Sequence, residues 1–258
     1  MRMATWNVNS VRTRIDRILA VLQRHDLDVL ALQELKCRDE QFPFGPFEEA
    51  GYEVACWGVN QWNGVAIVSR IGITDVERGF EGQPLFKDAL EPRAIGATCG
   101  GVRVWSLYVP HGRGLNDPHM TYKLAWLERL RDHVAGVVSS DPHAQLALVG
   151  DFNIAPRDED VWDMAAFADS THVSAPEREA FASLLAAGLT EVTRPLAEGY
   201  TYWDYQKLRF PKNEGMRIDF ALCSPDLAAR VEAVRIDRDE RKGKGASDHV
   251  PVVIEIAD

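Results

Sequence analysis

The fold of this chain is decided around one stretch, Leu148-Val149-Gly150-Asp151-Phe152-Asn153-Ile154-Ala155-Pro156. The apolar run before Gly150 predicts a buried strand, and Gly150 ends it by allowing a turn that a side chain would obstruct. Asp151 and Asn153 lie two residues apart, so an extended backbone places both side chains on one face. An ordinary strand-to-turn junction would use the same residues, because Asp and Asn favour turns. Other segments must decide between a turn and a functional site.

The composition is that of a globular protein. The 258 residues fit one large domain or two small ones, and 46% of them are hydrophobic, enough for a substantial core. No apolar stretch approaches membrane-spanning length and the amino terminus lacks the apolar core of a signal peptide, so we expect a cytoplasmic protein without membrane contact. The four cysteines show no metal-ligand spacing and are expected to be buried reduced thiols. The net charge of −10 argues against indiscriminate nucleic-acid binding.

Apolar patterning predicts many strands with interspersed helices. A strand at 3–6, a helix with its apolar stripe over 15–22 and a strand at 28–34 form a strand-helix-strand unit. Further strands are expected at 52–57, 65–69, 73–78, 94–99, 102–108, 216–222 and 252–256, and helices over 122–138 and 176–187. No linker or repeat divides the chain. We therefore expect a single domain, 1–258, of the α/β (α+β) class, in which two packed mixed sheets are flanked by helices.

Four aromatic residues lie within Tyr200-Thr201-Tyr202-Trp203-Asp204-Tyr205. They fit two interpretations. One is the alternating packing of a strand, and the other is an aromatic surface that meets a nucleic acid beside Lys207, Arg209, Lys212 and Arg217. The sequence leaves both interpretations open.

Polar side chains recur where the apolar strands meet loops. They are Asn7, Glu34, Tyr108, Asp151, Asn153, Asp219, Asp248 and His249. Strand ends gathered at one rim would form a cleft lined by carboxylates, amides, a phenol and an imidazole, which suits metal-assisted hydrolysis of an anionic ester. Hard carboxylate oxygens favour Mg²⁺, with Mn²⁺ as a substitute, and no cysteine or histidine spacing supports zinc.

Six segments resemble, in order, the motifs of the exonuclease III class of abasic-site DNA endonucleases, in the endonuclease/exonuclease/phosphatase superfamily. They are Trp6-Asn7-Val8-Asn9-Ser10-Val11-Arg12, Leu32-Gln33-Glu34-Leu35-Lys36, Tyr108-Val109-Pro110, Gly150-Asp151-Phe152-Asn153-Ile154-Ala155-Pro156, Arg217-Ile218-Asp219 and Ser247-Asp248-His249-Val250-Pro251. The resemblance covers essentially the whole chain and is closest to the bacterial DNA-repair branch. It implies a four-layer α/β sandwich. It also implies Mg²⁺-dependent cleavage of the phosphodiester 5′ to an abasic site in duplex DNA, leaving a 3′-hydroxyl, with 3′-to-5′ exonuclease and 3′-end-cleaning activity in base excision repair.

The resemblance assigns roles around the water and the metal. Glu34 would ligate the metal with help from Asn7 and Asp248. Asp151 would orient or deprotonate the attacking water, and Asn153 would position that water. In this assignment Asp151 is the base rather than a metal ligand.

The resemblance also assigns the phosphate contacts. His249 would donate to a non-bridging oxygen and stabilise transition-state charge. Its orienting partner should be Asp219, because the adjacent Asp248 and His249 point to opposite faces of an extended segment. Tyr108 would hydrogen-bond the phosphate or assist the leaving oxygen.

Substrate binding is expected from a wider set of residues. They are Asn9, His111, Arg113, Tyr202, Trp203, Lys212, Met216 and Ile218, with the loop Arg241–Lys244 as a further backbone contact. Three of them, Tyr202, Met216 and Ile218, match positions that wall the pocket for a flipped sugar in eukaryotic relatives. His111 departs from the family, which usually has Asn there, and an imidazole is bulkier and titratable.

Two other functions share parts of this pattern. A non-catalytic nucleic-acid-binding regulator could use the same fold, but the presence of every expected carboxylate and of His249 argues against it. A phosphatase of a lipid headgroup could use the same chemistry. The aromatic and basic stretch after Tyr200, without a membrane-binding segment, favours DNA carrying abasic sites or blocked 3′ ends as the partner. We expect a monomer with no obligate protein partner.

Overall fold

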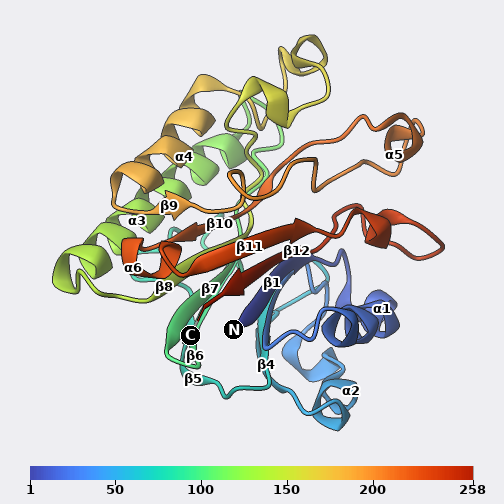
Figure 1. The fold of residues 1–258 in the computed structure, drawn as a ribbon. Helices are drawn as coiled ribbons and strands as arrows, with labels where there is room; N and C mark the ends of the chain where they lie inside the picture. Colours follow the sequence, from blue (N-terminus) through green and yellow to red (C-terminus); the bar gives the residue numbers. More distant parts are fainter. Residues whose placement is uncertain (258) are drawn as a thin grey trace.

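Two six-stranded mixed sheets lie between layers of helices in the computed structural model, which describes residues 1–257 (Figure 1). The first sheet has the order β11-β12-β1-β2-β4-β3, from β11 (Val231–Ile236), β12 (Val252–Ile256), β1 (Arg2–Asn7), β2 (Val29–Gln33), β4 (Val65–Ser69) and β3 (Glu53–Trp57). The second has the order β5-β6-β7-β8-β10-β9, from β5 (Thr74–Arg78), β6 (Ala94–Cys99), β7 (Val102–Tyr108), β8 (Leu146–Asp151), β10 (Asp219–Cys223) and β9 (Thr190–Glu191). The expected four-layer sandwich is confirmed.

The helices cover the outer faces of the two sheets. Figure 1 shows α1 (Val11–Arg24) and α2 (Phe44–Glu49) outside the first sheet, and α3 (Pro118–Ser140) and α4 (Ala175–Ala186) outside the second. Two short helices, α5 (Arg209–Lys212) and α6 (Pro225–Ala228), lie in connections. Among the described helices, none has both the length and the apolarity needed to cross a bilayer.

Strand β1 illustrates how the sequence divides between the layers. Met3 packs in the central cluster between the two sheets, whereas Ala4 and Trp6 pack in the outer cluster with the helix residues Ile18 and Leu22. Successive side chains of a strand point to opposite faces, so a strand buried on both sides is almost continuously apolar. A third cluster joins the second sheet to α3 and α4. The four cysteines are buried and free, as expected.

The strand directions bring distant polar residues to one edge. Strands β1 and β2 run parallel, as do β7 and β8, with Asn7 opposite Gln33 and Tyr108 opposite Asp151. Their carboxyl ends therefore share an edge of the sandwich. Strand β10 runs antiparallel to β8 and begins at that edge, with Asp219 opposite Asp151. Strand β12 likewise begins there, antiparallel to β1, just after His249.

Several predicted boundaries were wrong. Strand β8 continues through Gly150 to Asp151, and β10 begins at Asp219 rather than at 216, because the backbone of Met216 pairs with Tyr202 and Val161 instead of with β8. Five elements were missed, namely β9, β11, α2, α5 and α6. Strand β11 lies at the edge of its sheet and carries exposed or half-buried residues throughout, so it lacks a continuous apolar run.

Candidate active site

Asn7 links the ends of two strands at the shared edge. Its buried Nδ2 donates to Glu34 Oε1 at 2.9 Å and to Asp151 Oδ2 at 3.0 Å, and its Oδ1 accepts from the Asn9 amide at 3.1 Å. Glu34 comes from the end of β2 and Asp151 from the end of β8, in the other sheet. The amide therefore holds two carboxylates from the two halves of the sandwich side by side.

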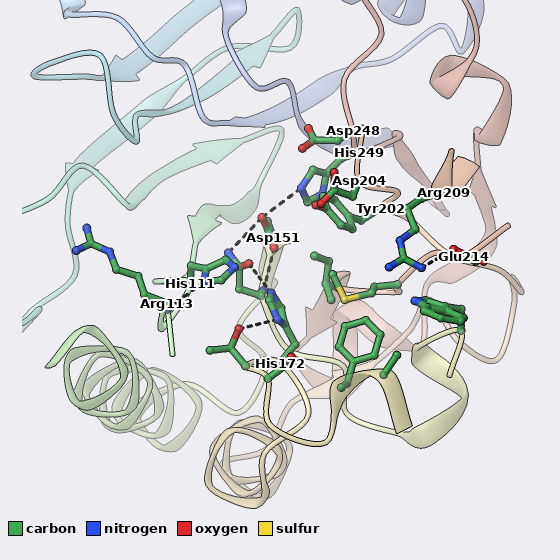
Figure 2. Close-up of a pocket in the computed structure, with 18 of the residues that line it drawn as sticks. His111, Arg113, Asp151, His172, Tyr202, Asp204, Arg209, Glu214, Asp248 and His249 are labelled. Atoms are coloured by element: carbon green, nitrogen blue, oxygen red, sulfur yellow. Dashed lines mark hydrogen bonds and ion pairs between the residues drawn. The ribbon is translucent and has the colours of Figure 1, made fainter. Parts of the chain in front are cut away.

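His249 lies between Asp151 and one further carboxylate, Asp219. Its Nδ1 is 2.9 Å from Asp219 Oδ2, and its Nε2 is 3.6 Å from Asp151 Oδ2 (Figure 2). Burial alone would lower the pKa of His249, but Asp219 and Asp151 raise it to about 10, so the ring is a cation at neutral pH. Asp248 faces the other way and accepts from Asn9 Nδ2 at 3.1 Å. The expected pairing of His249 with Asp219 is therefore present.

Asp151 is oriented by the turn that follows it. The backbone amide of Asn153 donates to Asp151 Oδ1 at 2.8 Å, and Asn153 Nδ2 donates to Asp151 Oδ2 at 3.3 Å and to the Val109 carbonyl at 3.0 Å. Burial raises the pKa of Asp151 to about 7, against the opposing attraction of His249. The carboxylate is thus fixed in place and is a better base near neutral pH than an exposed aspartate.

Three groups could share a cation. Ligand atoms of Glu34, Asp151 and His249 all lie within 4.8 Å of one another. Because His249 is protonated, it is a poor ligand, and the hard carboxylate oxygens of Glu34 suit Mg²⁺ better. Lys36 Nζ already lies 2.8 Å from Glu34 Oε2, so this carboxylate attracts positive charge. The expected ligand Asp248 is outside this group.

Strained backbone conformations cluster around the same site. Residues with positive φ include Asn9 at 44°, Glu34 at 54°, Arg113 at 61°, Asn153 at 51° and His172 at 81°. Such conformations cost energy for residues other than glycine and persist where the surrounding contacts fix them. The surrounding contacts therefore hold these residues in conformations that lower the stability of the fold.

An open cavity of about 540 Å³ lies over the carboxylates. Its lining includes residues named from the sequence, which are Glu34, Tyr108, His111, Arg113, Asp151, Asn153, Tyr202, Arg209, Met216, Ile218, Asp248 and His249. It also includes Trp162, Phe167, His172, Asp204 and Glu214, which the sequence did not single out. The ring of Tyr202 packs against that of His249, with centroids 4.8 Å apart. Residues from strand ends of both sheets and from the connecting loops thus line one cavity.

Comparison with known proteins decides the family. The model of the Endonuclease/Exonuclease/phosphatase family matches residues 4–249. The chain belongs to this family. It is 28% identical to exodeoxyribonuclease III of Haemophilus influenzae, over 98% of each chain. Among solved structures it is similar to the 3′ phosphatase NExo of Neisseria bound to a product DNA hairpin (38% identical, all of both chains, TM-score 0.94) and to an AP endonuclease of Archaeoglobus fulgidus (33% identical, 99% of each chain, TM-score 0.92). The expectation of a DNA-repair nuclease is confirmed.

His111, the departure from the family pattern, is neutral in this nuclease. The Arg113 amide donates to His111 Nδ1 at 3.0 Å, so the neutral ring carries its proton on Nε2. Burial lowers the pKa of His111 to about 4, with a further lowering by Lys123. The ring is therefore a hydrogen-bond donor, as an asparagine amide would be, and does not titrate near neutral pH. The Arg113 side chain points away from Asp151 (Figure 2).

His172 is the functional candidate that sequence reasoning missed. Its Nε2 lies 3.2 Å from Asn153 Oδ1, its Nδ1 lies 2.9 Å from Thr171 Oγ1, and its ring meets that of His111 edge-on at 4.7 Å. No strand or helical pattern surrounds it, so only the path of its loop brings it to the cavity of the nuclease.

Three expected substrate contacts lie outside this cavity, namely Asn9, Trp203 and Lys212. Trp203 is 1% exposed, its ring packs against Phe210, and its carbonyl accepts from Arg241. Its burial excludes direct contact with a substrate in this conformation, which corrects the expectation. Lys212 is exposed on α5, 4.0 Å from Glu214. The aromatic stretch is therefore neither a strand nor one continuous surface, since Tyr202 faces the cavity and Trp203 faces the interior.

Proposed function

We propose that this chain hydrolyses phosphate esters of damaged duplex DNA, as a monomer. The substrates are the phosphodiester 5′ to an abasic site, cut to leave a 3′-hydroxyl, and blocking groups or nucleotides at 3′ ends. The observation that carries the proposal is the facing pair of Asp151 and His249, whose Oδ2 and Nε2 are 3.6 Å apart. The reaction needs a base for water and a cation for the phosphoryl oxygens, and this pair supplies one of each.

Asp151 acts as the base in this proposal. Its raised pKa of about 7 lets it accept a proton from water at neutral pH. Asn153 keeps the carboxylate in one orientation through the two hydrogen bonds that it donates to it. Since Asn153 Nδ2 and Oδ1 already have partners within the protein, the residue positions the water through Asp151.

His249 and Tyr108 receive the phosphate. His249 donates from Nε2 to a non-bridging oxygen, while Asp219 holds its Nδ1 and keeps the ring charged. Burial raises the pKa of Tyr108 well above its usual value, and the charge of Glu34 raises it further, so the phenol stays protonated and donates a hydrogen bond. Both donors are fixed before substrate arrives, which is how preorganised groups stabilise developing charge.

Glu34 would hold Mg²⁺, or Mn²⁺ in its place, and Asn7 keeps this carboxylate beside Asp151, the base. When bound, the ion neutralises phosphate charge and lowers the pKa of coordinated water. Asp248 supports this site through Asn9, because Asn9 Nδ2 donates a hydrogen bond to Asp248 Oδ1. Asn9 Oδ1 in turn accepts from Lys36, the residue that pairs with Glu34.

A basic surface beside the site supports binding of DNA by an acidic protein. Arg12, Lys36 and Arg38 line a neighbouring hollow together with Trp62, whose surface is 63% exposed. Arginine and lysine contact phosphates, and an exposed indole offers a face for stacking. Binding through such contacts weakens as salt rises.

The test compares three duplexes, carrying an abasic analogue, a 3′-phosphate or a recessed 3′-hydroxyl end. We expect Mg²⁺-dependent turnover that stops with EDTA, and relatives named as an AP endonuclease and as a 3′ phosphatase justify both kinds of substrate. His249→Ala should lose about 10²–10⁴-fold in rate, because a charged donor to the transition state is removed. His143→Ala is the matched control. This histidine is exposed, and its ring hydrogen-bonds to Asp226 alone among the described residues. Failure on all three duplexes with Mg²⁺ would refute the proposal.

A further inference from the structure

A second cavity lies on the other face of the segment that walls the active site. Met216 and Ile218 line the active-site cavity, whereas Arg217, between them, lines a separate cavity of about 550 Å³. Successive side chains of an extended segment point to opposite faces, which accounts for the division. The second cavity also receives Arg157, Arg194 and Arg238, so it gathers four guanidinium groups.

Arg217 is buried without a complete set of partners. It is only 4% exposed, Nη1 donates to the Ala197 carbonyl at 2.7 Å, and Nη2 donates to Thr193 Oγ1 at 2.9 Å. Both acceptors are neutral, and Nε has no hydrogen-bond partner in the part of the chain that the structure describes. Within residues 1–257 no carboxylate forms an ion pair with Arg217. A buried charge in this state is costly unless something pairs with it.

The nearby carboxylates are already engaged. Asp160 accepts from Arg194 Nη2 with both oxygens, each at 2.7 Å, and Glu191 accepts from the backbone amides of Thr193 and Arg194. Burial lowers the pKa of Arg217, and the attraction of Glu191 and Asp160 at longer range does not reverse this direction. Neither Glu191 nor Asp160 forms an ion pair with Arg217, so its buried charge has no directly paired carboxylate among the described residues.

The whole lining of the cavity has four arginines and three acidic residues. Glu159 lies 3.6 Å from Arg157, and Glu198 is an exposed rim residue. Arg238 makes no ion pair among the described residues and lies over the ring of Phe210, with its guanidinium carbon 4.4 Å from the centroid. An anion that enters would meet Arg157 and Arg238 at the rim and Arg217 inside.

We propose that this cavity binds a phosphate-bearing anion, with Arg217 as its buried contact and Arg157 and Arg238 as its rim contacts. Guanidinium groups recognise phosphate with several directed hydrogen bonds, and the anion would supply the negative partner that Arg217 lacks among the described residues. The source is either inorganic phosphate or the phosphate of a nucleotide. The half-buried ring of Tyr200 lines the same cavity and offers a face on which a base can stack.

Occupancy would be transmitted to the active site through one short segment. Met216 exchanges both backbone hydrogen bonds with Tyr202, each at 2.9 Å, and Tyr202 packs on His249. An anion that holds Arg217 therefore restrains the neighbours that form the substrate wall. The inference stands apart from the proposed function, because it concerns binding at a different cavity.

The experiment follows the Nε–H resonance of Arg217 in ¹⁵N-labelled protein during titration with inorganic phosphate at constant ionic strength. We expect a saturable shift. The rim variant Arg157→Gln/Arg238→Gln should weaken phosphate binding about tenfold or more, since two charged donors are lost. Both rim residues are exposed, so the variant is expected to fold.

The control variant is Arg113→Gln, which alters a cation of the active-site cavity. It should leave the Arg217 shift unchanged. A shift that disappears in Arg113→Gln but survives in the rim variant would overturn the proposal, and so would the absence of any phosphate-dependent shift. A parallel titration with adenosine 5′-monophosphate separates the sources, because tighter binding than inorganic phosphate identifies a nucleotide and equal binding identifies the phosphate group alone.

Discussion

His249 and Asp219 are 30 residues apart in sequence, and yet Nδ1 of the one lies 2.9 Å from Oδ2 of the other. Both residues are buried. Asp219 begins β10 and His249 lies just before β12, and these two strands belong to different sheets. The contact keeps the imidazole charged and fixes the direction of Nε2 toward Asp151. It is a positioning contact between the two sheets at their shared edge.

Asp219→Asn should reduce kcat strongly while changing KM little. The neutral amide no longer stabilises the imidazolium, so we expect a loss of about 10²–10⁴-fold in kcat. Steady-state kinetics on whichever DNA substrate the wild type cleaves will measure it. Asp204→Asn is the matched control, because this exposed residue lines the same cavity but accepts only from the Gln206 amide. A wild-type kcat for Asp219→Asn would show that His249 does not depend on this partner.

Lys123 and Glu177 form a fully buried ion pair that supports the site from behind. Both side chains are 0% exposed, and Lys123 Nζ donates to Glu177 Oε1 at 2.5 Å and to the Asn153 carbonyl at 2.6 Å. Lys123→Met should cost about 3–5 kcal/mol in the free energy of unfolding, because it leaves a buried carboxylate without its cation.

The double variant Lys123→Met/Glu177→Gln should recover part of that loss, since it removes the stranded charge and keeps an amide that can cap α4. Urea unfolding of the two single variants and the double variant measures the coupling. If the effects of the single changes simply added, the pair would carry no interaction of its own.

Gly150 is required by the close approach of two strands. A Cβ at this position would lie 2.0 Å from the Leu107 carbonyl oxygen, and φ is +151°. Gly150→Ala should therefore cost about 3 kcal/mol or more, because backbone atoms must move. Gly136→Ala is the control. Gly136 lies on the exposed side of α3, and an added Cβ there would have no atom within 4 Å. The helical glycine should instead gain about 0.5–1 kcal/mol on substitution. Thermal unfolding compares them, and equal effects would contradict the argument.

Asp237 should make stability depend on pH under acid conditions. Its hydrogen bond with His25 and its contact with Arg24 lower the pKa to about 2, below the ordinary value of 3.8. A carboxyl with a lower pKa in the folded state contributes stability that is complete above its unfolded pKa. That stability is lost as the pH falls through the folded pKa. The loss should therefore develop between about pH 4 and pH 2.

Urea unfolding as a function of pH measures this dependence. Asp237→Asn should flatten the curve in that window. Asp239→Asn, at an exposed carboxylate 2.6 Å from Lys242, should leave it unchanged. The same slope in all three proteins would exclude Asp237 as the cause.

Local sequence predicted the buried strands with accuracy. Strands β4, β6, β7 and β12 have the bounds that the apolar patterns indicate, because each is buried on both faces and bounded by turn residues. Edge strand β11 was missed because its residues are exposed or half-buried. The segment 216–218 was wrongly predicted as part of a strand, because Met216 pairs with Tyr202 and Val161 instead. The motif order also predicted most residues of the candidate site.

By itself, the sequence determined the strand-helix-strand units, the polar residues at their ends and the chemistry that those residues can support. The tertiary structure alone decided the charges and the partners. It buried Asp151 beside His249, so that burial raises the pKa of Asp151 to about 7 and the neighbouring aspartates raise that of His249 to about 10. It also brought in His172 from a loop without any pattern and placed Lys36 against Glu34. It also turned Arg217 away from Met216 and Ile218 into a second cavity. Burial and contacts between distant segments cause these effects, and neither is encoded in a local pattern of residues.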